Sequence, residues 1–134
     1  MLFRSRVNAM PRAIWFPKMD KFETSMYLLG WGGAVTDAET TLTPVMRFPA
    51  DGGVGQNNWG RVRNEAFEQL AIAQATEADP AKREALIKQA LGIYKSQVHL
   101  IPLHRQVIPW AVRRNVEVVH RPDNWFEVAW ITIK

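Results

Sequence analysis

The pattern of hydrophobic and polar positions predicts two adjacent helices in the middle of the chain. Asn64, a favourable N-cap residue, begins a first helix that ends near Thr76 and places Phe67 and Ala71 on one apolar face. Asp79-Pro80 supplies the N-cap and the first residue of a longer second helix. Its apolar residues recur at i, i+4, i+7 and i+11, and the buried stripe that this spacing predicts is Ile87, Leu91, Tyr94 and Val98.

Shorter elements are predicted near the N-terminus. Arg6 to Met10 alternates weakly, as a short strand does, and Ala13 to Lys21 has a helical pattern. Because Pro17 lies inside this helix, we expect it to be bent or in two parts. Its expected inward side consists of Ile14, Trp15 and Met19.

Three segments connect this region to Asn64. Ser25 to Trp31 begins with a short apolar run and predicts a strand. Asp37 to Met46 predicts a short helix, whose length Pro44 limits. Residues 48–61 hold four glycines and an Asn-Asn pair, which predicts a loop, and we expect Trp59 to fasten it to the rest of the molecule.

The pattern changes from helical to strand-like at Leu100. Strands are predicted at 100–108, 116–120 and 125–133, with a turn at 121–124. The fold class is therefore α/β or α+β, with a β-rich tail that needs partners.

Composition limits the classes of protein that the chain can represent. Its 134 residues suffice for about one domain. No apolar run approaches the ~20 residues of a transmembrane helix, so membrane insertion is not expected. The formal charge of +4 is modest and the basic residues are dispersed, which does not indicate a nucleic-acid surface. Met1 to Ser5 looks foreign to the rest of the chain, and we expect a truncated reading frame.

The sequence lacks the motifs of the common catalytic and metal sites. His99 and His104 are five residues apart, without the spacing of a metal-binding pair, so no metal site or cofactor is expected. There is no cysteine and no G-x-S-x-G motif to supply a nucleophile. Asp37 and Glu39 lie at a predicted helix start, where capping explains Asp37. An esterase- or deaminase-like enzyme thus finds no support, and the chain is not expected to be an enzyme.

Residues 25–41 have the features of a ligand-contacting corner. The predicted strand ends in Gly30, Gly32 and Gly33, which permit close backbone approach, and Trp31 among them offers a large flat surface. A new helix can begin shortly afterwards, at Thr36 or Asp37.

In order and spacing, several segments resemble the C-terminal part of extracytoplasmic solute-binding proteins of family 5, the peptide, oligopeptide or nickel receptors of ABC importers. The resemblance begins with Val7 to Tyr27 and continues through the Leu28-Leu29-Gly30-Trp31-Gly32-Gly33 run to Asp37. The later matching segments are Asn64-Glu65-Ala66-Phe67-Glu68-Gln69-Leu70, with Ala66 and Glu68 as variants, Asp79-Pro80-Ala81-Lys82-Arg83 with Leu86 and Ala90, and Ile101-Pro102-Leu103-His104. Together they cover nearly all of the chain after Ser5.

The resemblance implies an α/β fold, namely the C-terminal part of a two-lobed, periplasmic-binding-protein-like fold of type II with a mixed sheet and packed helices. Residues 1–106 would form the later part of the second, smaller lobe, and residues 107–134 would be strands returning into the first lobe. The hinge near 104–109 would include His104, Arg105, Gln106 and Val107.

The resemblance also implies which residues contact the ligand. In the peptide-binding members the Trp lies against the ligand, and an Asp three residues later pairs with the amino terminus of the peptide. The corresponding ligand-binding residues here are Trp31, Gly32, Gly33, Ala34 and Asp37. Since Ala34 occupies the position of the Asp, a buried ammonium group there would lack a partner unless Asp37 reaches it, at a cost of several kcal/mol.

The expected function is therefore that of an importer receptor that captures a peptide-like or other small polar solute between two lobes. Its implied partners are the permease subunits, and its implied location is the periplasm, with a signal peptide upstream. The alternative is a small basic module that binds nucleic acid or protein. It would require one face bearing Arg61, Arg63, Arg113, Arg114 and Arg121 beside Trp59 and Trp110.

Overall fold

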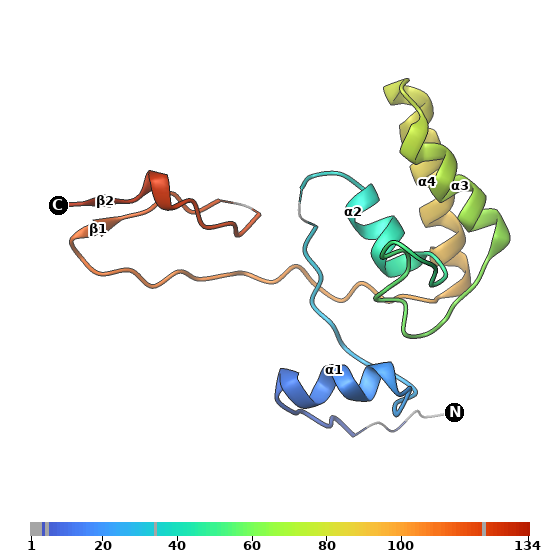
Figure 1. Cartoon of the computed structure of the whole chain (residues 1–134), viewed down its shortest axis with the longest axis horizontal. Coiled ribbons are helices and arrows are strands. Elements are labelled where there is room, and N and C mark those ends of the chain that lie inside the picture. Colours follow the sequence, from blue (N-terminus) through green and yellow to red (C-terminus); the bar gives the residue numbers. More distant parts are fainter. Residues whose placement is uncertain (1–3, 5, 34, 122) are drawn as a thin grey trace.

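The computed structural model describes residue 4 and residues 6–33, 35–121 and 123–134. It contains a helical body, residues 37–98, and an arm, residues 100–134, which extends away from the helices (Figure 1). The elements are α1 (Arg12–Asp20), α2 (Glu39–Thr41), a π-helical turn η1 (Leu42–Met46), α3 (Glu65–Thr76), α4 (Pro80–Gln97), β1 (Val116–Glu117), a 3-10 turn η2 (Val128–Trp130) and β2 (Thr132–Ile133).

Helices α3 and α4 form a hairpin whose starting points are fixed by capping, as the sequence predicts. The Asn64 side chain accepts a hydrogen bond from the amide of Phe67 at 2.9 Å. The Asp79 carboxylate accepts bonds from the amides of Ala81 and Lys82 at 2.9 and 3.0 Å. These contacts satisfy amides that have no partner within the helix.

The core lies where α2 and η1 pack against this hairpin. Its buried members are Leu42, Met46, Phe67, Ala71, Ala90 and Tyr94. The rings of Phe67 and Tyr94 lie 4.6 Å apart, and the Tyr94 hydroxyl donates a hydrogen bond to the carbonyl of Met46. Burial raises the pKa of this hydroxyl.

The predicted stripe on α4 is wrong at two of its four positions. Leu91 and Val98 are 45% and 63% exposed, whereas Ala90 is completely buried. The buried face follows the same i, i+4, i+7, i+11 spacing but begins at Arg83, one turn earlier. The π-helical turn covers the hairpin near Ala90 and Tyr94, and nothing in the described part of the chain covers the last turn of α4 as fully.

The predicted short helix at 37–46 is confirmed as a helical region that begins at Glu39 and widens into a π-turn. Pro44 has no amide to donate within a helix, so it disfavours continuation of the regular pattern. The amide of Arg47 instead bonds to the carbonyl of Leu42, five residues earlier, at 3.0 Å. The loop at 48–61 folds back here, and the amide of Gly55 donates to the carbonyl of Thr43 at 2.9 Å.

Helix α1 is continuous through Pro17, so of the two expected forms, bent or in two parts, the two-part helix is not observed. Met19 is buried and Trp15 half-buried, but Ile14 is exposed, contrary to its predicted inward position. The Trp59 indole donates a hydrogen bond to Asp20 at 2.9 Å, which confirms that this residue fastens the loop. An aromatic cluster forms around this contact and consists of Trp15, Phe16, Tyr27 and Trp59.

The strand predictions fail over most of their length. Residues 6–10, 25–31 and 100–108 contain no strand, and the predicted strands at 116–120 and 125–133 shrink to β1 and β2. These two pair antiparallel, with Val116 opposite Ile133 and Glu117 opposite Thr132. An extended segment becomes a strand only when another segment accepts its backbone hydrogen bonds, and the described residues supply no such neighbour for the other segments.

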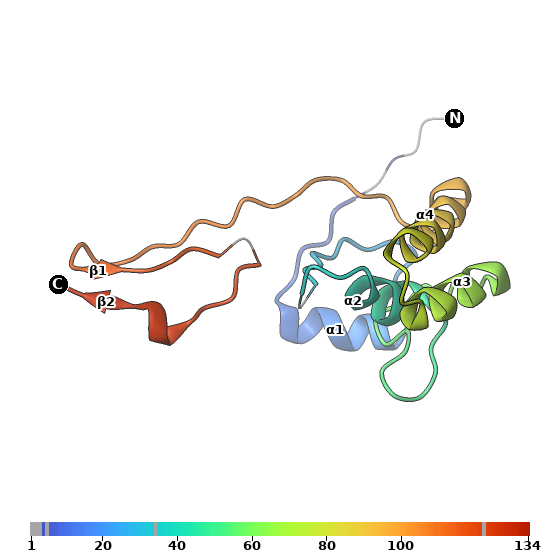
Figure 2. The same ribbon diagram turned by 90° about the horizontal axis from the view of Figure 1, so that it is seen from above.

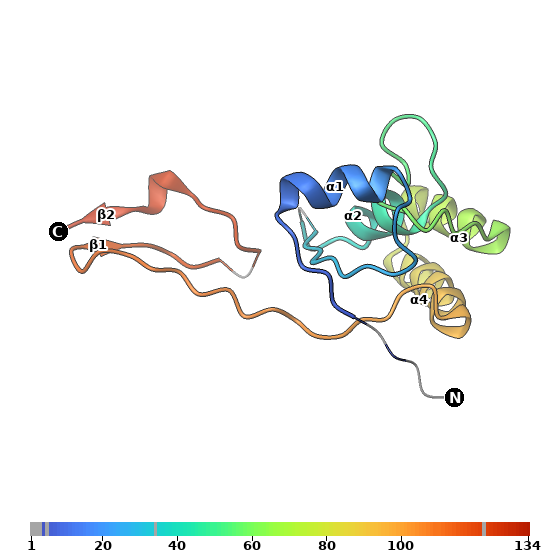
Figure 3. The same cartoon turned by 90° about the horizontal axis from the view of Figure 1, so that it is seen from below.

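Figures 2 and 3 show the arm from two opposite sides, in both cases running clear of the helices. Within the part of the chain that the structure describes, no helix is both long enough and apolar enough to cross a bilayer. The mixed sheet and the division into residues 1–106 and 107–134 stay predictions.

Candidate ligand-binding site

The candidate site is the segment between the aromatic cluster and α2, here called the Trp31 segment (residues 28–33 and 35–37). Tyr27, just before it, packs against the rings of Trp15 and Trp59 at 6.0 and 5.8 Å. Asp37, at its end, forms an ion pair with Arg83 on α4. Both ends are therefore attached, while the indole of Trp31 between them is 42% exposed. This leaves a large aromatic surface available for contact.

Two of the predicted site glycines have different surroundings. A Cβ atom on Gly33 would lie 2.4 Å from the Thr40 hydroxyl and 3.0 Å from the carbonyl of Val35, so a side chain there would clash with the start of α2. A Cβ atom on Gly32 would meet nothing within 4 Å. Local packing thus requires glycine at position 33, whereas Gly32 is open to solvent. Ala34 lies outside the described residues.

The Asp37 carboxylate is bound to the protein through both of its oxygens. Oδ2 accepts from Nη1 of Arg83 and Oδ1 from Nη2, both at 2.8 Å, and Oδ1 also accepts from the amide of Glu39 at 2.8 Å. The hydrogen bonds from Arg83, followed by the one from Glu39, lower the pKa of Asp37 to about 2. The bond to Glu39 is the capping contact that the sequence predicts. The partnership with Arg83 is a second role that the sequence does not reveal.

Arg83 belongs to a larger hydrogen-bonded network that the sequence analysis did not identify. Its Nε donates to the carbonyl of Gln74 at 3.0 Å and its Nη2 to the Gln74 side chain at 3.1 Å. The Gln74 amide, which is completely buried, donates to Glu39 and to the carbonyl of Ala71. The presence of a network could have been predicted from the position of Arg83, a charged residue at the spacing of the apolar residues on the buried face of α4.

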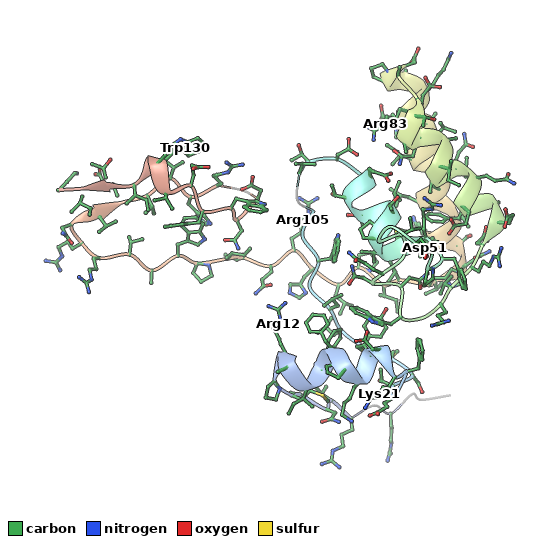
Figure 4. All side chains as sticks on the ribbon, in the orientation of Figure 1. Arg12, Lys21, Asp51, Arg83, Arg105 and Trp130 are labelled. Atoms are coloured by element: carbon green, nitrogen blue, oxygen red, sulfur yellow. The ribbon has the colours of Figure 1, made fainter. Side chains whose placement is uncertain are left out.

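The four predicted hinge residues are exposed and belong to no helix or strand. Figure 4 shows Arg105 on the first part of the arm, near the helical body. The side chain of Gln106 approaches the Trp31 segment, because its Oε1 lies 4.0 Å from the Cβ position of Gly30. The structure therefore brings the predicted ligand-contacting corner next to the predicted hinge. A shallow hollow of about 290 Å³ adjoins this stretch and is lined by Gln106, Ile108, His120, Arg121 and Asn124.

Of the five arginines that a nucleic-acid surface would require, three are engaged in local contacts: Arg61, Arg63 and Arg121. Arg61 lies over the ring of Phe22 at 4.7 Å, and Arg63 lies over Phe48 at 5.3 Å. Arg121 stacks on Trp130 and pairs with Asp123. Among the described residues, no group of three or more His, Asp or Glu side chains is placed to hold a metal ion.

Two proteins of known binding activity are similar to this chain. The oligopeptide-binding protein OppA of Bacillus subtilis (strain 168) is 27% identical over 109 residues, which is 81% of this chain. The di/tripeptide-binding protein 4 of Pseudomonas aeruginosa (strain UCBPP-PA14) is 33% identical over 94 residues, or 69% of this chain. The chain spans only 19% and 17% of the length of these relatives.

Neither family models nor solved structures match the chain. The chain is thus distantly similar to part of two peptide-binding proteins, both of which are named for binding and not for catalysis.

Proposed function

We propose that this chain is part of an ABC importer receptor that captures a peptide-like or other small polar solute between two lobes. The observation that carries the proposal is the similarity, over 81% and 69% of the chain, to two proteins that are both named for peptide binding. The exposure of Trp31 on a segment attached at both ends adds to it. The location proposed with this function is the periplasm, and the proposed partners are the permease subunits.

The exposed apolar side chains of the arm support a larger, two-lobed assembly. Soluble proteins rarely leave so many large apolar groups together in water. The proposal places residues 107–134 in the other lobe, which would cover these groups. Those that are exposed include Val107, Val112, Val119, Trp125, Phe126, Val128, Trp130 and Ile133.

The ion pair between Asp37 and Arg83 limits the class of ligand that we propose. Arg83 already pairs with the charge of the Asp37 carboxylate, which supports the proposal that Asp37 does not replace the acid that is absent at Ala34. A peptide ammonium group buried beside Ala34 would lack a charged partner. We therefore propose a solute whose amino terminus is blocked, or bound elsewhere in the cleft.

Calorimetry on the complete receptor, expressed from the full reading frame, tests the function. The probes are trialanine and N-acetyl-trialanine, and the blocked peptide is expected to bind at least as tightly. Trp31→Ala should weaken its binding by about tenfold or more, because stacked aromatic contacts dominate such sites. Ile72→Ala, on the exposed face of α3, is the matched control and should change nothing.

Ala34→Asp should improve the affinity for trialanine selectively. Absence of binding heat for both peptides would contradict the proposed peptide-like ligand. Equal binding by the Trp31→Ala variant would remove Trp31 from the site.

A further inference from the structure

We propose that Arg83 is a positioning residue for the candidate site: it clamps Asp37 to the α3–α4 hairpin and thereby holds the Trp31 segment in one arrangement. Its expected effect on ligand binding rests on the proposed function, whereas the clamp itself is a property of the chain. Asp37, which the resemblance placed among the ligand-binding residues, becomes a support for Trp31.

The first observation is that the Trp31 segment has few attachments of its own. Among the described residues, 28–33 take part in no hydrogen bond, and the segment lies outside any strand. The side chain of Leu28 is exposed, as is that of Val35. Ordering such a stretch costs backbone conformational entropy at every residue. The contacts at its two ends therefore have to offset that cost.

The second observation is the geometry of the contact at the α2 end. Arg83 and Asp37 are 46 positions apart in sequence, and they form two parallel hydrogen bonds of 2.8 Å. Such a bidentate pair restricts orientation as well as distance, which a single ionic contact does not. The same carboxylate accepts the amide of Glu39, so the start of α2 and the end of the Trp31 segment are fixed by one group.

The third observation is that Arg83 is itself held in place. Its Nε and Nη2 donate to the carbonyl and the side chain of Gln74, respectively, and Gln74 is completely buried. The planar guanidinium can make these four bonds together, whereas the point charge of a lysine cannot reproduce the fork. The side chains of Arg83 and Asp37 are only 29% and 34% exposed, which limits screening by water.

These observations give the clamp a clear function. An aromatic side chain binds a ligand more tightly when its backbone is already ordered, because less entropy is lost on binding. Arg83 would supply that order from a helix that is not itself part of the Trp31 segment. Substitution should therefore loosen the Trp31 segment and leave the hairpin folded.

Hydrogen–deuterium exchange of the 134-residue chain tests the clamp directly. In Arg83→Lys and Arg83→Met, the amides of residues 37–42 should exchange about tenfold faster, while amides in the centres of α3 and α4 keep their rates. Asp37→Asn preserves the shape of the side chain and should accelerate the same amides by about threefold. The control is Lys88→Met, which removes an exposed ion pair with Glu84 on the same helix and should change nothing.

Unchanged exchange at 37–42 in Arg83→Met and Asp37→Asn would overturn the inference. If Arg83→Met accelerates exchange throughout the hairpin, the result for Asp37→Asn decides between a local clamp and a general structural role. The inference would also be contradicted if Asp37→Asn accelerated amide exchange equally at residues 37–42 and in the α3–α4 hairpin.

Calorimetry on the complete receptor separates this inference from the proposed function. With N-acetyl-trialanine, Arg83→Lys should bind about tenfold more weakly than the wild type, and Lys88→Met should bind equally well. No binding by the wild type would count against the proposed ligand, with the exchange result still deciding on the clamp. If Arg83→Lys changed neither the affinity for the peptide nor the amide exchange, the clamp would be rejected and the proposed function would stand.

Discussion

The helical body buries large apolar side chains in a core, whereas the arm leaves such side chains exposed to solvent. In the body, Leu42 and Phe67 are almost completely buried and form part of one continuous core. In the arm, Val107 is 87% exposed and Ile133 is 73% exposed. The buried apolar side chains of the body therefore pack against one another. Those of the arm form no such core in the described part of the chain.

Polar contacts span longer stretches of sequence in the body than in the arm. The body is held by pairs far apart in sequence, such as Asp37–Arg83, which are 46 positions apart, and Arg47–Glu68, which are 21 positions apart. In the arm, the Arg121–Asp123 pair joins residues two positions apart, and the longer-range contacts, Trp110–Asn124 and Glu117–Lys134, are 14 and 17 positions apart and exposed. Long-range pairs form only when the chain is folded, so they stabilise a specific tertiary structure, whereas a pair two positions apart can form in an unfolded chain as well.

The largest expected effect contrasts a core ring with an exposed arm residue. Phe67→Ala removes a ring that packs against Tyr94, and should lower the free energy of unfolding by about 3–5 kcal/mol. Val128→Ala in the arm should change it by less than about 0.5 kcal/mol. Urea denaturation followed by circular dichroism measures both. A loss for Val128→Ala that equals the loss for Phe67→Ala would show that the arm packs as tightly as the body.

A second contrast lies within the body and compares two glutamates of α3: one that binds residues far away in sequence and one that is exposed. Glu68 accepts a hydrogen bond from Nε of Arg47 at 2.8 Å and another from the amide of Phe48 at 2.5 Å. Glu68→Gln should therefore cost about 1–3 kcal/mol of unfolding free energy.

Glu65→Gln is the matched control, since Glu65 is exposed and lies 3.9 Å from Arg63. It should cost less than about 0.5 kcal/mol in the same denaturation experiment. If the two variants are equally stable, the link between η1 and α3 does not depend on this carboxylate.

The same contrast explains which elements could be predicted from the sequence. The α3–α4 hairpin was predicted because its signals are local: Asn64 and Asp79 cap amides two or three residues away. The extents of the strands were not predictable, because a strand depends on a neighbouring segment: β1 and β2 lie within two of the predicted strands but are much shorter. In the described part of the chain, the only segments that pair as strands are Val116–Glu117 and Thr132–Ile133, which are separated by 14 residues.

The candidate site contains both features that local sequence predicts and features that depend on tertiary packing. Trp31 and its glycines could be identified from local sequence, and so could the capping role of Asp37. The partnership of Asp37 with Arg83 and the link from Arg83 to Gln74 could not, because they depend on how α4 packs against α3 and on the path of the segment before α2. The register of the buried stripe on α4 depends on the same packing.

A smaller effect tests whether the hairpin depends on its local signals. Asp79→Ala removes the acceptor of two amide hydrogen bonds at the start of α4, and should cost about 1 kcal/mol of unfolding free energy. In thermal denaturation this corresponds to a decrease in Tm of about 4 °C. Glu84→Gln, which changes an exposed residue in the same helix, is the control. An unchanged Tm for Asp79→Ala would mean that packing alone fixes the start of the helix.

The smallest expected effect is a pH dependence that separates a long-range ion pair from a local one. The folded state lowers the pKa of Asp37 to about 2, so folding favours its charged form. Its contribution is complete above the ordinary carboxyl range near about 4, falls as the pH decreases toward about 2, and is absent below that value. Because the side chain is 34% exposed, we expect the contribution to stay below about 1 kcal/mol.

Urea denaturation of the wild type and Asp37→Asn between pH 2 and pH 7 measures this contribution as the difference between the two proteins. The difference should be largest near neutral pH and should disappear at the acidic end. Asp123→Asn in the arm is the matched variant, since Arg121 also lowers the pKa of Asp123. Because this pair joins residues two positions apart, the unfolded chain retains much of the interaction, and the variant should match the wild type at every pH. A larger pH-dependent loss for Asp123→Asn than for Asp37→Asn would mean that the arm, and not the clamp on α4, carries the greater tertiary constraint.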